Sequence, residues 1–390
     1  MDKTTVGNLC KPYVGQLRLD GDTLIDYFDI ASVDNIEKQI TGYTTYTLAK
    51  APSRARKQVK RGNILVSTVR PNLNAVALFD KETENTPVVS TGFCVLECKV
   101  DTSPRFLLRY LQSKSFVRAM VPQATGASYP AVSDKIIRDA QIPAYSYEEQ
   151  IQIADVLDAA ANIISKRKQQ LQKLDDLVKA RFVELFGNPI SNPMKWDIYQ
   201  LEECLERIDN GKSFICSDKP RTGDNPAILK LSAATYGDYR PNENKALLDE
   251  SLFVESSEVH AGDLLFTRKN TPELVGAAAY VQNTPPKLMM PDLIFRLVPN
   301  EKVNAVFLWQ LINCKEFRPV IQAISGGSAK SMSNISKERL GKIKVICPPR
   351  ELQDSLIPFV KRVDKSKAVI QKALDETQLL FDSLMQEYFG

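Results

Sequence analysis

Residues 147–187 read YEEQIQIADVLDAAANIISKRKQQLQKLDDLVKARFVELFG, and residues 350–390 read RELQDSLIPFVKRVDKSKAVIQKALDETQLLFDSLMQEYFG. Both segments repeat apolar residues at helical spacing and fill the remaining positions with charged and amide side chains. The pattern predicts two long helices, from about Tyr147 to Phe186 and from about Glu351 to Phe389, the second one kinked in its opening turns by Pro358. Each helix would span about 60 Å, because a helix rises about 1.5 Å per residue.

A seven-residue repeat places one apolar stripe on each predicted helix. Such helices are too polar to be buried on all sides and too apolar to stand alone in water, so the simplest partner of each is the other, running antiparallel. An ordinary helical bundle or a homodimeric coiled coil would produce the same stripes and remains an alternative. The residues that we expect in the helix pair are Leu157, Ile164, Leu171, Val178, Leu185, Val360, Leu374, Phe381 and Tyr388.

The rest of the chain is duplicated as well, at an offset of 200 to 203 residues. A glycine turn before a strand, an amphipathic helix, and a small-residue loop that ends at a helix-starting serine each occur twice in the same order. The matched segments are 61–68 with 261–268, 106–111 with 307–312, 126–133 with 329–336, and 171–187 with 374–390. The sequence therefore predicts an α/β domain at 1–146, a helix at 147–187, a second α/β domain at 188–349 and a second helix at 350–390.

The residue inventory excludes several classes of site. His260 is the only histidine among the 390 residues, so histidine-based triads and multi-histidine metal sites are excluded. The seven cysteines are scattered and never form C-x-x-C, which indicates reduced core thiols. Cys94 and Cys98 come closest to ligand spacing, but they lie in an apolar, strand-like run with no histidine nearby. We expect no metal and no cofactor.

Charge and hydropathy leave the function open but restrict the location. The net charge of +4 is too small to indicate nucleic-acid binding by itself. We find no signal-peptide pattern and no apolar run of the roughly 20 residues that a membrane helix requires. We therefore expect a cytoplasmic protein without a membrane partner.

Two segments partly match catalytic or phosphate-binding motifs, but each lacks residues that its motif requires. Asp224-Asn225-Pro226-Ala227 lacks the second proline and the aromatic residue that DNA amino-methyltransferases need to hold the target amine. Gly211-Lys212-Ser213 has Glu206 where a phosphate-binding loop requires its first glycine. No histidine base accompanies a serine or cysteine nucleophile, so catalysis by this chain is not expected.

The order of these segments resembles a known family. An α/β domain and a helix ending Leu-Phe-Gly, followed by a second domain and a helix ending Tyr-Phe-Gly, is similar to the specificity subunit of type I restriction-modification systems. The resemblance covers essentially the whole chain. Its local marks lie at the junctions before each long helix: Ile142-Pro143 with Glu148-Glu149-Gln150, and Cys347-Pro348-Pro349 with Glu351-Leu352-Gln353.

The resemblance implies a fold, a function and partners. The fold would be α/β, with two pseudo-twofold-related target-recognition domains separated by a long antiparallel two-helix coiled coil. Each domain would read one half of a split site in double-stranded DNA, and the helices would set the spacing. Two methyltransferase subunits would dock on this frame and restriction subunits would join them, while the chain itself would catalyse nothing.

Candidate DNA contacts follow from residue chemistry. Arginine and lysine bind phosphates and guanine, and asparagine binds adenine through two hydrogen bonds. The first half has a block without acidic residues between Lys50 and Arg61, and both halves have a polar loop after the glycine turn and a small-residue loop further on. The candidates are Lys50, Arg54, Arg56, Lys57, Lys60, Arg61, Arg70, Asn72, Asn74, Ser128, Tyr129, Lys212, Lys219, Arg221, Lys230, Arg240, Arg268, Lys269, Asn270, Lys330, Ser331 and Asn334.

Other interpretations of the same residues remain open. The basic block could be a solvated surface loop, and the asparagines could cap loops. A self-contained DNA methyltransferase or nuclease with an unrecognised active site, or a coiled-coil adaptor that binds no DNA, is the alternative for the whole chain.

Overall fold

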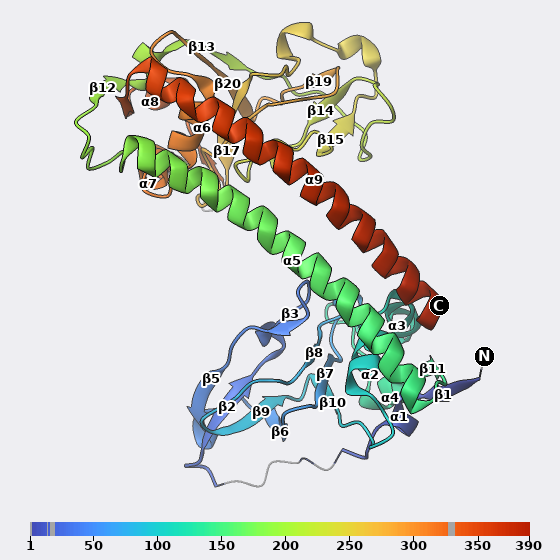
Figure 1. Cartoon of the computed structure of the whole chain (residues 1–390). Coiled ribbons are helices and arrows are strands. Elements are labelled where there is room, and N and C mark those ends of the chain that lie inside the picture. The colour runs from blue at the N-terminus through green and yellow to red at the C-terminus, as the bar shows by residue number, and fades with distance from the viewer. Residues whose placement is uncertain (1, 14, 16–19, 327–331) are drawn as a thin grey trace. The chain divides into compact units, whose positions relative to one another are not determined.

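The computed structural model describes residues 2–13, 15, 20–326 and 332–390, which form two compact units (Figure 1). Unit 1 consists of Met1–Gln169 with Gln371–Gly390, and unit 2 consists of Gln170–Ile370. Both predicted long helices are confirmed, as α5 (Tyr147–Phe186) and α9 (Arg350–Phe389). The helical conformation of α9 continues through Pro358. Each unit therefore contains one α/β domain and one part of each long helix, and the predicted four-segment division stays a prediction.

Unit 1 is built on two small sheets. The strands across the four-stranded sheet are β5 (Thr44–Thr47), β2 (Leu24–Phe28), β9 (Thr86–Ser90) and β6 (Ala55–Gln58), of which β2 and β9 are parallel. The strands across the antiparallel three-stranded sheet are β10 (Phe93–Leu96), β7 (Ile64–Ser67) and β8 (Val76–Leu78). Two short antiparallel pairs are β1 (Lys3–Thr5) with β11 (Gln141–Pro143), and β3 (Val33–Asp34) with β4 (Gln39–Ile40).

Four short helices complete unit 1: α1 (Val6–Leu9), α2 (Pro104–Leu111), α3 (Lys114–Met120) and α4 (Asp134–Asp139). Their starts follow from the sequence, because serine hydroxyls accept hydrogen bonds from the first free backbone amides. Ser103 caps α2, Ser113 caps α3, and Ser133 caps α4 as the sequence predicts.

Unit 2 has the same plan. The four-stranded sheet contains, in order, β13 (Leu205–Asn210), β20 (Ile294–Pro299), β16 (Leu264–Thr267) and β18 (Ala278–Tyr280). The three-stranded sheet contains β15 (Asn244–Ala246), β14 (Ala227–Leu229) and β19 (Leu288–Met289). Two antiparallel pairs are β12 (Asp197–Gln200) with β22 (Lys344–Cys347), and β17 (Lys269–Asn270) with β21 (Ser333–Asn334). The short helices are α6 (Ala305–Asn313), α7 (Arg318–Ala323) and α8 (Lys337–Gly341).

The topology confirms the duplication. The order β10-β7-β8 in unit 1 corresponds to β20-β16-β18 in unit 2, and the parallel pair β2-β9 corresponds to β14-β19. The predicted glycine turns precede β7 and β16, where Gly62 and Gly262 adopt positive φ angles of 91° and 98°. Glycine adopts this left-handed conformation without the steric penalty that a Cβ would add.

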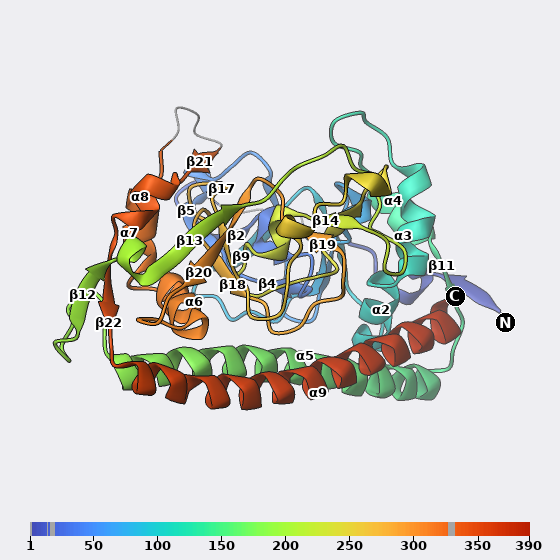
Figure 2. The same cartoon turned by 90° about the horizontal axis from the view of Figure 1, so that it is seen from above.

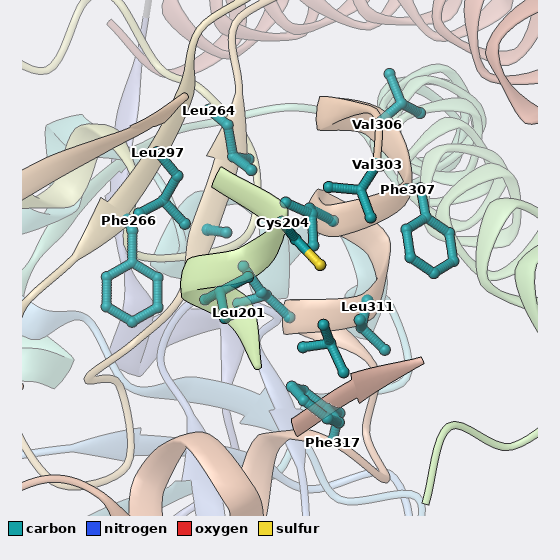
Figure 3. Packing of buried hydrophobic residues seen from close by; sticks show 14 of the residues in the cluster. Leu201, Cys204, Leu264, Phe266, Leu297, Val303, Val306, Phe307, Leu311 and Phe317 are labelled. Atoms are coloured by element: carbon teal, nitrogen blue, oxygen red, sulfur yellow. The ribbon is translucent and has the colours of Figure 1, made fainter. Parts of the chain in front are cut away.

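The core of unit 2 joins its sheets to both long helices. Leu201, Cys204 and Leu264 belong to one buried cluster with Phe307 and Leu311 of α6 (Figure 3). The same cluster contains Val178, Phe182 and Phe186 of α5 together with Leu356, Val360 and Val363 of α9. The long helices are therefore held by the core of the domain as well as by each other.

Within each unit, the segments of α5 and α9 pack antiparallel, and the two ribbons run side by side in both views (Figures 1 and 2). In unit 2, the Lys367 ammonium lies 2.6 Å from a carboxylate oxygen of Asp175. In unit 1, the Arg167 guanidinium donates to the carbonyl of Ala373 and the hydroxyl of Thr377. The pairing places low residue numbers of α5 beside high residue numbers of α9, as predicted.

The predicted stripes lie on the buried side of both helices. Leu157, Ile164, Val178 and Val360 are buried, and Leu171, Leu185, Leu374, Phe381 and Tyr388 are half-buried. Phe182, Phe186, Val363 and Phe389 were missed, although each is at most 5% exposed. The predicted residues occupy a single position of the heptad and so cover only part of the buried helix face. Helices that pack against a domain as well as against each other bury a wider face, which includes residues at other heptad positions.

Candidate nucleic-acid interface

In unit 1, the loop after β7 and the small-residue loop before α4 are joined by backbone hydrogen bonds. Thr68 N donates to Gly92 O (2.8 Å), Val132 N donates to Thr68 O (2.9 Å), and Arg70 N donates to Pro130 O (2.6 Å). Residues 68–73, 91–92 and 125–132 thus form one surface, which we call the first loop cluster.

Arg70 and Tyr129 are the prominent side chains of the first loop cluster. Arg70 has a left-handed backbone (φ 50°), a conformation that costs a non-glycine residue about 1 kcal/mol or more. Its guanidinium lies 4.9 Å from the ring centre of Tyr129, which is 69% exposed. An exposed arginine stacked on a tyrosine can still present its donor groups to a base or a phosphate.

Lys38 and Asn74 form a hydrogen-bonded support next to the first loop cluster. The Lys38 ammonium donates to the backbone carbonyl and the side-chain oxygen of Asn74, and the Asn74 amide nitrogen donates to Leu111 O (3.0 Å). Burial lowers the pKa of Lys38. Asn74 is only 9% exposed, so the structure favours loop capping over base contact at this position.

Unit 2 repeats the same hydrogen-bond frame. Arg268 N donates to Leu293 O (3.0 Å) and Ile335 N donates to Arg268 O (2.8 Å), which match the two bonds of Thr68. Lys269 pairs with Asn334 and Asn270 pairs with Ser333 between β17 and β21. We call residues 268–271, 293, 326 and 332–335 the second loop cluster. The two sequence offsets, 200 and 203, are thus reproduced in the backbone pairing.

The two frames carry different side chains. Thr68, Val69 and Arg70 in unit 1 correspond to Arg268, Lys269 and Asn270 in unit 2. The Arg268 guanidinium lies over the Phe295 ring, 4.8 Å from the ring centre. It also donates two hydrogen bonds, each of 3.3 Å, to the side-chain oxygen of Asn334. Asn270 is 8% exposed and bonds to Thr235 and Thr271, which again favours a structural role.

The basic block between Lys50 and Arg61 is divided by the fold. Arg54 lies next to the first loop cluster, because its carbonyl accepts from Thr91 N (2.8 Å). Lys57 is occupied within the unit, since its ammonium lies 2.7 Å from Asp134 and donates to Phe93 O. Arg61 is at the opposite end of β7 and pairs with Glu82 at 3.3 Å.

The remaining candidates differ in whether their charged groups form hydrogen bonds or ion pairs within the protein. Arg221 is internal, with a side chain 7% exposed that donates to Asn225 O and Pro286 O. Four more cations have acidic neighbours: Lys60 (Glu97), Lys230 (Glu243), Arg240 (Asp238) and Lys269 (Asp292). Among the candidates in the described part of the chain, the cations without an ion pair are Lys50, Arg54, Arg56, Arg70, Lys212, Lys219 and Arg268. Asn72 and Ser128 are exposed, whereas Lys330 and Ser331 lie outside the described residues.

The way each long helix is joined to its domain is not evident from the sequence. In unit 1, Gln150 accepts from Ser103 N (3.0 Å) and donates to Tyr145 O (3.0 Å). In unit 2, Gln353 accepts from Asn304 N (2.9 Å) and donates to the carbonyls of Lys302 and Pro348. The glutamines of the two junction motifs therefore fix the first turn of each long helix to the start of α2 or α6.

The residues considered for catalysis are not assembled into a site. His260 is an exposed turn residue whose backbone amide donates to Asp263 (2.8 Å), and Asp224 lies in an exposed turn. All seven cysteines are free thiols. Among the described residues, no group of three or more histidine, cysteine or acidic side chains is arranged to hold a metal. No helix in the described part of the chain has the length and hydropathy to cross a membrane.

Comparisons with known proteins agree with this architecture. Residues 19–174 match the model of the type I restriction modification DNA specificity domain. The EcoEI type I restriction enzyme specificity subunit of Escherichia coli is 32% identical over 203 residues, which cover 50% of this chain and 34% of that protein. The chain thus matches about a third of the length of that relative.

Two solved structures share the fold along the whole chain. The type I restriction-modification S subunit from M. genitalium superposes with a TM-score of 0.57 at 15% identity, covering 100% of this chain and 96% of that one. A chain from a structural study of complex assembly and conformational transition of the type I R-M system has a TM-score of 0.55 at 21% identity, covering 100% and 97%. Residues 19–174 are therefore similar to the type I restriction modification DNA specificity domain, and the whole chain shares the fold of these two structures.

Proposed function

We propose that this chain is the DNA sequence-recognition subunit of a type I restriction-modification complex. Each unit binds one half of a bipartite target in double-stranded DNA, and the paired helices set the spacing between the halves. The observation that carries the proposal is the pair of loop clusters, which share one backbone frame and differ in their side chains. A constant frame with variable side chains suits a protein that reads two different half-sites.

The side chains in the loop clusters have the chemistry of base readers. Arg70 and Arg268 can donate two hydrogen bonds to guanine, while Asn72 and Asn334 can bond to adenine. Arg268 would exchange its bonds to Asn334 for bonds to the base, which frees the asparagine at the same time. Tyr129 and Phe295 hold the two arginines against an aromatic face and so limit their freedom before binding.

Phosphate contacts come from the cations that the protein does not neutralise itself. Arg54 is next to the first loop cluster, and Lys50 and Arg56 are exposed on the same part of the chain. In unit 2, Lys212 and Lys219 are exposed. Each phosphate contact releases a counterion from the DNA, so affinity falls as the salt concentration rises.

Chemistry is supplied by partner subunits. Two methyltransferase subunits dock on the frame and restriction subunits join them, while this chain contributes no catalytic group and no cofactor. The relative from E. coli bears the name of a specificity subunit, and one of the structural neighbours comes from a study of complex assembly. We place the assembly in the cytoplasm, where the host DNA is.

The test is a salt titration of DNA binding by the chain assembled with its methyltransferase subunits. Replacing Arg54 and Arg70 by alanine removes two proposed contacts of unit 1. We expect weaker binding from the loss of both contacts, and a slope of log affinity against log salt that is smaller in magnitude by about 1, because Arg54 is the phosphate contact of the two.

The matched control is Lys81→Ala, which removes one exposed charge at the opposite end of β8 from the first loop cluster. The control should leave both affinity and slope unchanged. An unchanged slope in the double variant would remove Arg54 from the interface, and an unchanged affinity would remove Arg70 as well. Methyl transfer by the purified chain alone, with S-adenosylmethionine and DNA, would contradict the non-catalytic role.

A further inference from the structure

Cys10 and Cys98 face each other across an antiparallel bridge in unit 1. Cys10 follows α1, and Cys98 follows β10. The bridge is flanked by two backbone hydrogen bonds, from Lys11 N to Glu97 O (2.8 Å) and from Lys99 N to Leu9 O (3.0 Å). This arrangement makes the cysteines a non-hydrogen-bonded pair, in which opposed Cα atoms lie about 4.5 Å apart.

That geometry is compatible with a disulfide. Disulfides join Cα atoms that are about 4.4 to 6.8 Å apart, and in a non-hydrogen-bonded pair the opposed side chains leave the same face of the ribbon. The backbone would therefore need little movement for the two sulfurs to bond. The other buried thiol of this region, Cys94, lies inside β10 and is opposed by Val66.

The two thiols differ in their solvent exposure and in their electrostatic surroundings. Cys98 is partly exposed and can meet a solute, whereas Cys10 is 2% exposed. The hydrogen bond from Cys98, together with the positive charges of Arg138 and Lys99, lowers the pKa of Cys10. The same hydrogen bond, with burial, raises the pKa of Cys98. Arg138 also braces both segments, because its guanidinium donates to Lys11 O (3.1 Å) and Val95 O (3.4 Å). A buried but readily ionised thiol beside an accessible one suits a resolving cysteine.

We propose that Cys10 and Cys98 are a redox modification site that forms a reversible disulfide with small disulfides such as oxidised glutathione. The accessible Cys98 thiol passes its proton to the adjacent Cys10 thiolate as its sulfur attacks one sulfur of oxidised glutathione, which breaks the glutathione disulfide, forms a mixed disulfide and releases one glutathione thiolate. That glutathione thiolate takes up the proton, so that Cys10 is again a thiolate. The Cys10 thiolate then attacks the Cys98 sulfur, forms the Cys10–Cys98 bond and releases the second glutathione. Two electrons pass to glutathione, and the two thiol protons are taken up by its two thiolates.

The disulfide would fix the amino-terminal segment to the three-stranded sheet of unit 1. That segment contains β1, which pairs with β11 directly before α5, and α1, whose residue Val6 donates to Ala140 O (3.0 Å). In a reducing compartment the pair stays as thiols, and it closes when the ratio of oxidised to reduced glutathione rises. The oxidised chain is the more stable form, because the cross-link restricts the unfolded state.

The experiment uses the full-length chain and glutathione buffers of increasing oxidised fraction. After quenching with acid and alkylating the free thiols, non-reducing peptide mass spectrometry measures the Cys10–Cys98 cross-link. We expect the cross-link to rise and fall reversibly with the buffer ratio, and the unfolding temperature to rise by several degrees in the oxidised state. Cys94 should stay alkylated throughout, since burial raises the pKa of its thiol to about 12.

Two variants separate the roles of the cysteines. In Cys10→Ser, Cys98 should accumulate as the mixed disulfide with glutathione, and in Cys98→Ser, Cys10 should remain a thiol. Neither variant should show the rise in unfolding temperature. The proposal is overturned if wild-type Cys98 ends only as the mixed disulfide, if both thiols stay free under oxidising conditions, or if cross-links join other cysteines instead.

Discussion

Phe186 and Phe389 are the last residues of the two long helices and occupy matched positions in the duplication. Each packs its ring against aromatic residues of the neighbouring domain. In unit 1, the Phe389 ring lies 5.3 Å from Phe106 and 5.7 Å from Tyr110 of α2. In unit 2, the Phe186 ring lies 4.9 Å from Phe307 of α6. The final Phe-Gly of each long helix is therefore an anchor that fixes the helix end on a domain.

Replacing Phe389 by alanine should destabilise unit 1 by about 3 to 5 kcal/mol, because the ring is 3% exposed and its removal leaves a cavity. Hydrogen exchange of α2 should accelerate accordingly, while exchange of α6 in unit 2 stays unchanged. Leu379→Ala is the control, since Leu379 is 71% exposed and its truncation should change stability by less than about 0.5 kcal/mol. Equal exchange of α2 in wild type and Phe389→Ala would show that Phe389 is not an anchor.

At the scale of elements, the pairing of α5 with α9 in unit 2 combines an apolar face with an electrostatic contact. Lys367 of α9 pairs with Asp175 of α5, and Asp364 lies close enough for its charge to interact with both. Burial raises the pKa of Asp364, and its side chain accepts from Gln282. The positive charge of Lys367 therefore offsets the repulsion between the carboxylates of Asp175 and Asp364 at the helix contact.

Lys367→Glu should destabilise unit 2 by about 1 kcal/mol at neutral pH, because it replaces a partly exposed ion pair by a third carboxylate. The loss should shrink as the pH falls and Asp364, then the other carboxylates, become protonated. Fluorescence follows unit 2 selectively during urea unfolding, since both tryptophans, Trp196 and Trp309, lie in it. Asp175→Lys in the same chain should restore stability, and the exposed control Lys365→Glu should not lower it.

Sequence reasoning was accurate where the signal is local. The bounds of α5 and α9, the glycine turns at Gly62 and Gly262, and the helix starts at Ser133 and Ser336 follow from periodicity, φ preference and capping. The sequence is less informative where a side chain is positioned by a distant partner. Nothing near Lys57 or Asn74 in the sequence indicates that the fold brings them to Asp134 and Leu111.

The anchors were missed for the same reason. Phe186 contacts Phe307, and Phe389 contacts Phe106, across more than a hundred residues of sequence. The signal that could have found them is the duplication itself. Phe-Gly recurs after both helices at the offset that also relates the helix-starting serines, which marks it as part of the repeated architecture.

At the scale of the whole molecule, one chain contains two units of equivalent architecture, each of which we propose reads one half-site. Each unit contains a loop cluster, a sheet that positions it and a helix end that is fixed by a phenylalanine. Because the two clusters differ in side chains, the two half-sites should differ in sequence. A change in one cluster should alter one half-site and leave the other unchanged.

The most direct measurement is selection of bound sequences from random duplex DNA by the chain assembled with its methyltransferase subunits, for wild type and for Arg268→Ala. The account predicts two specified blocks separated by an unspecified gap of fixed length, with Arg268→Ala relaxing one block only. A single uninterrupted block, or relaxation of both blocks by Arg268→Ala, would contradict it.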